Sequence, residues 1–293
     1  MRLKYNILWF EDNKRYYEIA SKDIHEYLEE QGYVPDLERR SDDTNLIEKM
    51  EEKDVDLILV DYNLKDKLKG DELVTTVRKN ELYTEAIFYA QNPPDLSRIK
   101  GQYEGVFYTT RKNLIEKTKK IIDLTIKKNQ DFSNIRGLFI AETVDMTKQI
   151  EQMISKILQL ENEQLDFFMD EIAQLPEFTD TSKFKIINRF FKSTIKSLHE
   201  KYEAMPSGKK RDQLMTRISN IKKTKSMFCN YANEVIEIRN ALAHGKPSGK
   251  KNCLIWKNKE RLYDEDYCKK IRKDFLKHNE NLNEMIKLLD QIF

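Results

Sequence analysis

The chain has 293 residues, enough for two domains that each bury a hydrophobic core, and a formal net charge of +2. Charged residues make up 35% and hydrophobic residues 39%, while Gly (8) and Pro (6) are scarce, which favours a soluble, helix-rich protein over a β-sandwich or a disordered chain. The sequence shows no bilayer-spanning apolar run, no apolar signal segment at its start and only three cysteines, so we expect a cytoplasmic protein without disulfides or membrane contact.

Residues 1–128 alternate between short apolar runs and segments of helical period. Four apolar runs have the length and the polar flanks of buried parallel strands: 5–10, 55–60, 86–90 and 105–109. A weaker candidate for a strand lies at 33–37. Helical periods occupy the intervals: 16–31, 44–52, 71–82 and 113–128. This alternation predicts a doubly wound α/β sheet with helices on both faces.

Acidic side chains follow two of the predicted strands. Glu11 and Asp12 come directly after the first apolar run, and Asp61 comes directly after the run at 55–60. The carboxyl ends of parallel strands are where such sheets collect ligands. Three converging carboxylates suit Mg²⁺, a hard cation that takes oxygen ligands.

Three segments together resemble the response-regulator receiver domain: Phe10-Glu11-Asp12, Val60-Asp61-Tyr62-Asn63-Leu64 and Gly70-Asp71-Glu72-Leu73. The resemblance implies a flavodoxin-like fold in which Asp61 is the phospho-acceptor. It also implies that Glu11 and Asp12, with Asp61, form the metal site, and that a phosphodonor or regulatory protein is a partner.

Two positions depart from the receiver pattern. Ala90 stands where the family has Ser or Thr, and Thr110-Arg111-Lys112 stands where it has Lys and Pro. Arg111 or Lys112 remains as a source of positive charge. The segment 91–104 also looks remodelled relative to a standard fourth helix. The alternative interpretation is a pseudo-receiver that binds protein without a phosphorylation switch.

The strand signals end after residue 128, and a short polar segment at 129–134 follows. We therefore predict one domain at 1–130 and a second at 131–293. The first carries 23 Lys and Arg against 26 Asp and Glu, and the second carries 29 against 24. The mild basic excess of the second domain is compatible with an RNA partner.

The second domain is predicted to be an all-α bundle of five helices: 135–160, 163–175, 182–204, 213–243 and 264–293. A small β-hairpin is expected from 253–256 and 260–263. Trp256 and Tyr263 would either stack a base or pack this hairpin. His25, His199 and His278 lie singly in helical stretches and are expected at the surface or in the core.

The segment Arg239-Asn240-Ala241-Leu242-Ala243-His244-Gly245 closes the predicted helix at 213–243. Gly245 followed by Pro247 is a helix stop signal. Arg239 and His244 are five residues apart, and we expect both near one helix face. An arginine beside an imidazole can bind a phosphodiester and move a proton, whereas the plain alternative is a histidine that stabilises a helix C-terminus.

These seven residues in a helical domain resemble the signature of the HEPN superfamily. The resemblance implies a metal-independent endoribonuclease with no cofactor, acting as a homodimer with a composite site. His244 would take the ribose 2′-OH proton, Arg239 would hold the phosphate, and Asn240 would orient either group, giving a 2′,3′-cyclic phosphate and a 5′-OH. Three lysines follow the motif: Lys246, Lys250 and Lys251. They would either guide the RNA backbone or form an ordinary basic loop.

Together the resemblances imply a receiver-like sensor that gates a HEPN effector, in antiviral defence or a toxin-type stress response. One alternative is a non-catalytic, response-regulator-like signalling protein whose helical half binds a protein or nucleotide partner. A further alternative is a HEPN domain that partners a nucleotidyltransferase.

Overall fold

The computed structural model describes residues 3–41, 47–48, 50, 54–64, 70–80, 83–91, 104–129, 132–159, 180–227 and 230–292. Contacts divide the chain into two compact units, Leu3–Asp131 and Phe132–Phe293. No helix within the described ranges is both long enough and apolar enough to cross a membrane.

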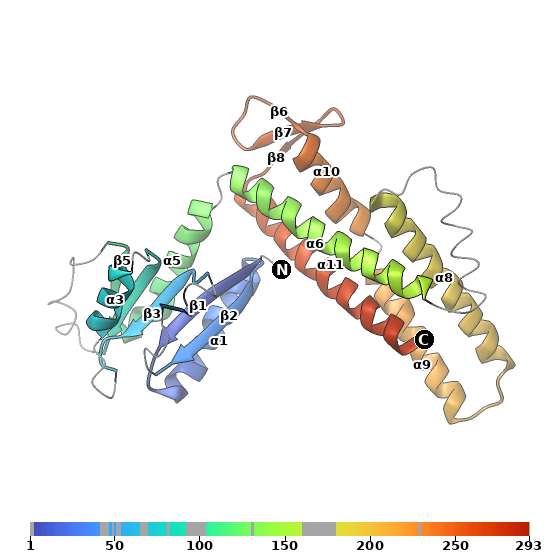
Figure 1. Cartoon of the computed structure of the whole chain (residues 1–293), viewed down its shortest axis with the longest axis horizontal. Coiled ribbons are helices and arrows are strands. Elements are labelled where there is room, and N and C mark those ends of the chain that lie inside the picture. The colour runs from blue at the N-terminus through green and yellow to red at the C-terminus, as the bar shows by residue number, and fades with distance from the viewer. Residues whose placement is uncertain are drawn as a thin grey trace. The chain divides into compact units, whose positions relative to one another are not determined.

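The first unit contains a parallel five-stranded sheet of order β2-β1-β3-β4-β5 (Figure 1). Its strands are β1 (Lys4–Phe10), β2 (Val34–Arg40), β3 (Leu57–Asp61), β4 (Glu85–Ala90) and β5 (Val106–Thr110). This order is the doubly wound, flavodoxin-like arrangement, so the predicted α/β sheet is confirmed. The weak strand candidate at 33–37 is also confirmed, and the strand continues to Arg40.

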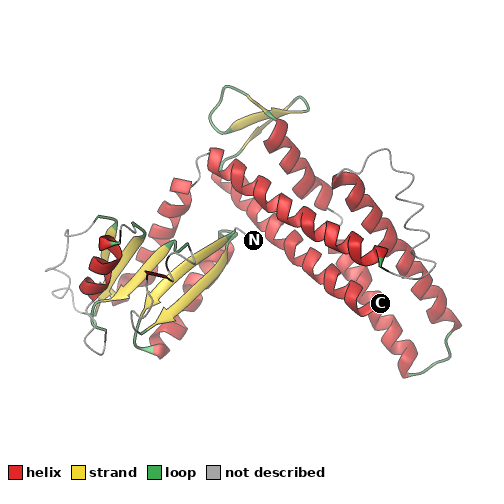
Figure 2. Cartoon of the chain, in the orientation of Figure 1, coloured by secondary structure: helices red, strands yellow, loops and turns green. Residues whose placement is uncertain are grey.

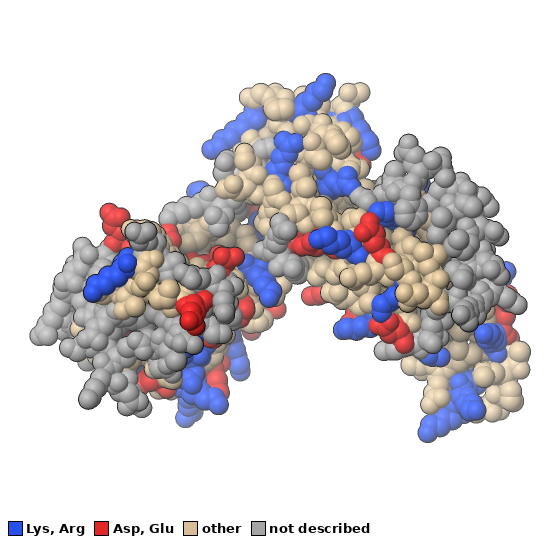
Figure 3. Space-filling view, in the orientation of Figure 1, with Lys and Arg blue, Asp and Glu red and all other residues tan. Residues whose placement is uncertain are grey.

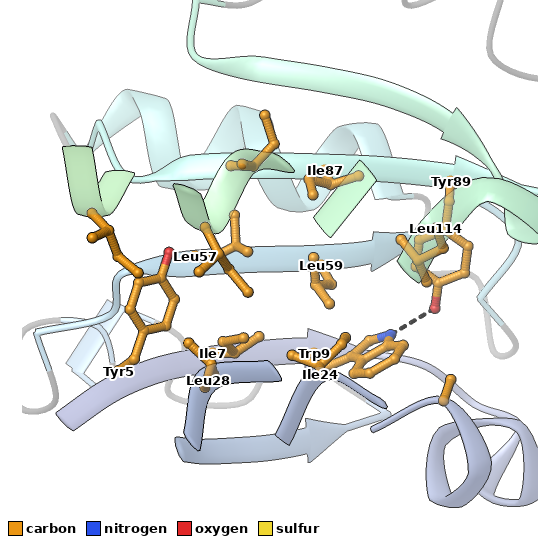
Figure 4. Packing of buried hydrophobic residues seen from close by; sticks show 14 residues of the cluster. Tyr5, Ile7, Trp9, Ile24, Leu28, Leu57, Leu59, Ile87, Tyr89 and Leu114 are labelled. Atoms are coloured by element: carbon orange, nitrogen blue, oxygen red, sulfur yellow. Dashed lines mark hydrogen bonds between the residues drawn. The ribbon is translucent and has the colours of Figure 1, made fainter. Parts of the chain in front are cut away.

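Neighbouring residues of a strand point to opposite faces of the sheet, and here both faces carry apolar side chains. Helices therefore cover both faces. One face packs against α1 (Lys14–Glu30) and α5 (Leu114–Asn129), with a core that includes Trp9, Leu59 and Ile87 (Figure 4). The other face meets α3 (Gly70–Lys79) through a cluster that includes Phe10, Val60, Phe88 and Val77. The predicted helix at 44–52 and the remodelled segment at 91–104 lie largely outside the described residues.

The second unit is mainly helical (Figure 2). Its elements include α6 (Phe132–Leu158), α8 (Asp180–Ala204), α9 (Lys209–Met227), η2 (Ala232–Ile236), α10 (Glu237–His244) and α11 (Glu265–Ile292). The helix α6 packs along α11, where the rings of Phe139 and Phe275 meet edge to face at 5.4 Å. It also contacts α8 and α10. The predicted helix at 163–175 lies outside the described residues.

The predicted helix at 213–243 is helical in both of its described parts, and 228–229 lie outside the described residues. The structure describes α9 as far as Met227, and from Tyr231 helical backbone runs through the π-helical turn η2 into α10. The π-helical turn was not predicted. In η2 the carboxylate of Glu234 lies 2.7 Å from Nε2 of His278, which is fully buried on α11. These two residues are far apart in the sequence, so the helical period of one segment could not indicate their contact or the π-helical turn that carries it.

A three-stranded antiparallel sheet follows α10 and accompanies the predicted helical bundle. Its strands are β6 (Lys246–Pro247), β7 (Cys253–Trp256) and β8 (Lys259–Leu262), in the order β6-β7-β8. The predicted hairpin is confirmed as β7 and β8, whereas β6 was not expected. Lys257 and Asn258 turn the hairpin with φ of 50° and 61°, the left-handed pair that a type I′ turn requires.

Candidate functional site

The helix α10 ends at His244 because the backbone becomes extended at Gly245, with φ −64° and ψ 141°. The glycine is therefore required by space and not by a left-handed conformation. A Cβ at this position would lie 2.3 Å from the carbonyl oxygen of Ala241 and 3.2 Å from the side chain of Leu254. The expected stop at Gly245 is confirmed, and a side chain at this position would meet first the Ala241 carbonyl of α10 and then Leu254 of β7.

Two members of the predicted motif are joined by a hydrogen bond. Arg239 donates from Nη1 to Oδ1 of Asn240 at 3.0 Å, and both side chains are half-buried. Asn240 and His244 are four residues apart and so share one helix face. Arg239 and His244 are about 140° apart around the helix, so the expectation that they share a face is wrong. Asn240 is the link, since it shares a helix face with His244 and accepts a hydrogen bond from Arg239.

His244 is exposed, and its ring lies beside the indole of Trp256, with centroids 6.0 Å apart and planes inclined by 32°. Trp256 is held by Glu237 on α10, which accepts from its Nε1 at 3.0 Å. The other oxygen of Glu237 lies 2.9 Å from Nζ of Lys257. These bonds dock the hairpin on α10 next to His244.

Arg136 on α6 donates from Nη2 to the carbonyl oxygen of Ala243 at 2.9 Å. This bond places a positive charge at the C-terminus of α10, where the helix dipole is negative. Sequence analysis missed Arg136 and Glu237. Their functional partners come from elements distant in sequence, and no spacing within one segment could have indicated them.

The three lysines expected to guide RNA lie in and beside the small sheet. Lys246 and Lys251 are exposed. Lys250 forms an ion pair with Glu260, with Nζ and Oε2 2.8 Å apart. The charge of Lys250 is therefore partly neutralised within the chain.

In the first unit, the carboxylates of Glu11, Asp12 and Asp61 each have an oxygen within 4.8 Å of the others. Glu11 follows β1 and Asp61 ends β3, the two strands where the strand order reverses and where such sheets bind ligands. A polar depression of about 490 Å³ is lined by Asp12, Asp61, Asn63 and Arg111 among others. Glu11 and Asp61 are buried.

Arg111 supplies the positive charge of this cluster. Its Nη2 lies 2.9 and 2.8 Å from the two carboxylate oxygens of Glu11 and 2.5 Å from Oδ2 of Asp61. Its guanidinium also sits 4.4 Å from the ring centre of Tyr16. Lys112, the other candidate, is exposed. Ala90 is buried at the end of β4, and because it is an alanine this position offers no hydroxyl.

Buried aromatic residues complete the network. Tyr89 donates its hydroxyl to Oε2 of Glu11 at 2.7 Å and accepts from Nε1 of Trp9 at 2.8 Å (Figure 4). Burial raises the pKa of Glu11, opposed by the hydrogen bonds from Tyr89 and the Asn13 amide and by the charge of Arg111. Sequence analysis missed Trp9 and Tyr89 because their positions indicated only core packing.

The carboxylates fit a divalent cation in number but not in their present contacts. Arg111 is bound to both oxygens of Glu11 and to Asp61, the oxygens that Mg²⁺ would use. Tyr89 and the amide of Asn13 also donate to Glu11. Mg²⁺ does not fit this arrangement unless Arg111 moves away.

The sequence matches no family model and no curated protein. Among solved structures, it is similar to the signal receiver domain of a protein described as a Luxo repressor from Vibrio parahaemolyticus, with 17% identity, a TM-score of 0.35 and coverage of 43% of this chain and 92% of that one. A fusion that carries amino acids 181–211 of the yeast Spc42 trimeric coiled coil matches at 16% identity, a TM-score of 0.35 and coverage of 43% and 81%. At this TM-score neither match adds to what the strand order shows.

Proposed function

We propose that this protein is a metal-independent endoribonuclease of HEPN type, whose site is formed by Arg239, Asn240 and His244. The supporting observation is the arrangement at the end of α10. An exposed imidazole lies one turn from an amide that is hydrogen-bonded to a guanidinium. These are the groups needed to move a proton and to hold a phosphate.

In the proposed reaction His244 accepts the proton of a ribose 2′-OH. The freed oxygen attacks the adjacent phosphorus, and the bond from phosphorus to the 5′ oxygen of the next nucleotide breaks. The proton is returned to that leaving oxygen, which yields a 2′,3′-cyclic phosphate and a 5′-OH. The Arg239 guanidinium stabilises the negative charge that develops on the phosphate oxygens.

A homodimer would complete the site. One chain offers a single imidazole at the end of α10, whereas proton removal and proton return are most effective with two groups. A second α10 across a two-fold axis would supply the second imidazole from its own His244.

The first unit is proposed to regulate this nuclease by binding a protein and without a phosphorylation switch. The supporting observation is Arg111, which pairs with both Glu11 and Asp61. A phosphodonor would have to displace this guanidinium before reaching Asp61. The proposed setting is antiviral defence or a toxin-type stress response.

The test is incubation of the purified chain with labelled RNA in EDTA. We expect cleavage products that end in a 2′,3′-cyclic phosphate, and no cleavage of DNA of the same sequence, which lacks the attacking hydroxyl. His244→Ala should lower the rate by about 10²-fold or more. His25→Ala, another exposed histidine, is the matched control and should cut normally. Equal cleavage by His244→Ala and the wild type would refute the proposal.

A further inference from the structure

A pocket of about 500 Å³ lies between the small sheet and the helical turns before His244. This volume is within the usual range for small-ligand sites. The pocket, called here the hairpin pocket, is lined among others by Asn233, Glu237, Trp256, Lys257, Lys259 and Arg261.

Positive charge exceeds negative charge in the hairpin pocket. Three cations line it against the single carboxylate of Glu237, which Trp256 and Lys257 already engage. Among the described residues, no ion pair involves Lys259 or Arg261. On the face shown in Figure 3, Lys and Arg atoms gather over β6–β8. The excess charge favours an anionic ligand.

Arg261 provides an independent indication. It is half-buried, and its guanidinium lies 5.8 Å from the ring centre of Tyr267. One nitrogen of that guanidinium, Nη1, is buried and has no hydrogen-bond partner among the described residues. Such orphaned donors are rare in folded proteins and are costly unless an acceptor reaches them. The oxygens of a phosphate group are the acceptors that a guanidinium binds best.

The aromatic wall of the pocket leads directly to His244. Trp256 lines the pocket, and the centroid of its ring lies 6.0 Å from that of His244. Bases of single-stranded RNA stack on exposed aromatic rings. A nucleotide in the pocket would therefore lie next to the imidazole.

We propose that the hairpin pocket binds one nucleotide of a single-stranded RNA, next to the linkage that His244 attacks. Lys259 and Arg261 contact its phosphate, and Trp256 stacks on its base. This assignment rests on the proposed nuclease function for its RNA substrate. Its binding contacts involve none of Arg239, Asn240 or His244, so the two can be tested separately.

The experiment titrates the full chain with a 2′-O-methyl oligoribonucleotide, which cannot be cleaved, and follows tryptophan fluorescence. Trp9 is fully buried in the first unit, so the change should come from Trp256 and should be absent in Trp256→Phe. Lys259→Glu and Arg261→Gln should each weaken binding about tenfold or more. Lys273→Glu, an exposed lysine on α11, is the charge-matched control and should bind normally.

Wild-type affinity in Lys259→Glu would overturn the assignment, even if the wild type cuts RNA. Lys259 is exposed, so this variant should fold, and circular dichroism checks both variants. Binding of a free mononucleotide with no binding of the oligomer would overturn the RNA assignment. Lost binding in both variants, in a chain that cuts no RNA, would support the pocket while refuting the nuclease.

Discussion

At the scale of single residues, Arg111 determines the chemistry of the first unit. One guanidinium bridges two buried carboxylates and rests against the ring of Tyr16. Burial raises the pKa of Asp61, and the hydrogen bond from the Asn63 amide and the charge of Arg111 oppose that rise. The negative charge of the cluster is thus partly neutralised by the chain's own cation, where a receiver would use a metal ion.

Arg111→Met should lower the free energy of unfolding by about 2–4 kcal/mol, because it leaves Glu11 and Asp61 without their counter-charge. Mg²⁺ should then bind the carboxylate oxygens that Arg111 no longer contacts. It should raise the melting temperature of the variant but not that of the wild type. Thermal denaturation of each protein in excess chelator and in added Mg²⁺, at matched ionic strength, makes the measurement.

The matched control is Lys112→Met, which removes the same charge from the neighbouring exposed residue. It should change neither the stability nor the response to Mg²⁺. A wild type that is stabilised by Mg²⁺ as strongly as Arg111→Met would show that Arg111 does not occupy the cation position.

At the scale of elements, α10 is short, and its position is set by its neighbours. The π-helical turn before it is tied to α11 by Glu234 and His278. Its last turn is tied to α6 by Arg136, and its first residue, Glu237, holds the hairpin. Gly245 allows β7 to approach the end of the helix. The orientation of His244 therefore depends on three contacting elements.

Gly245→Ala should destabilise the protein by about 1–3 kcal/mol, because the new methyl group would overlap the Ala241 carbonyl and force the backbone to shift. Gly137→Ala is the matched control in the exposed part of α6, where a Cβ meets nothing within 4 Å. It should stabilise by about 0.5–1 kcal/mol. Urea denaturation of both variants checks the pair, and equal stability would contradict the steric argument.

At the scale of the whole molecule, the proposed composite site requires two chains. Arg239→Ala and His244→Ala should each be inactive alone. After the two are mixed and allowed to exchange subunits, about half of the dimers should carry one of each. Such mixed dimers retain one arginine and one histidine and should recover measurable RNA cleavage. An unmixed sample of each variant is the control, and no recovery despite proven exchange would show that each site lies within one chain.

The sequence by itself determined which segments form the sheet and most of the helices. Buried strands and amphipathic helices leave a period in the chain, and that period is a local property. The acidic residues after β1 and β3 could also be located, because strand ends in a parallel sheet meet at one edge. Arg239, Asn240 and His244 were found because they lie within one short segment.

Only the tertiary structure decided how these groups are used. Arg111 is 100 residues from Glu11 in the sequence, and Glu237 is 19 residues from the indole that it holds. The π-helical turn before α10, the strand β6 and the hairpin pocket likewise depend on contacts between separate elements. Periodicity reports the environment of each residue but not the identity of its partner, so pairings across the chain required the fold.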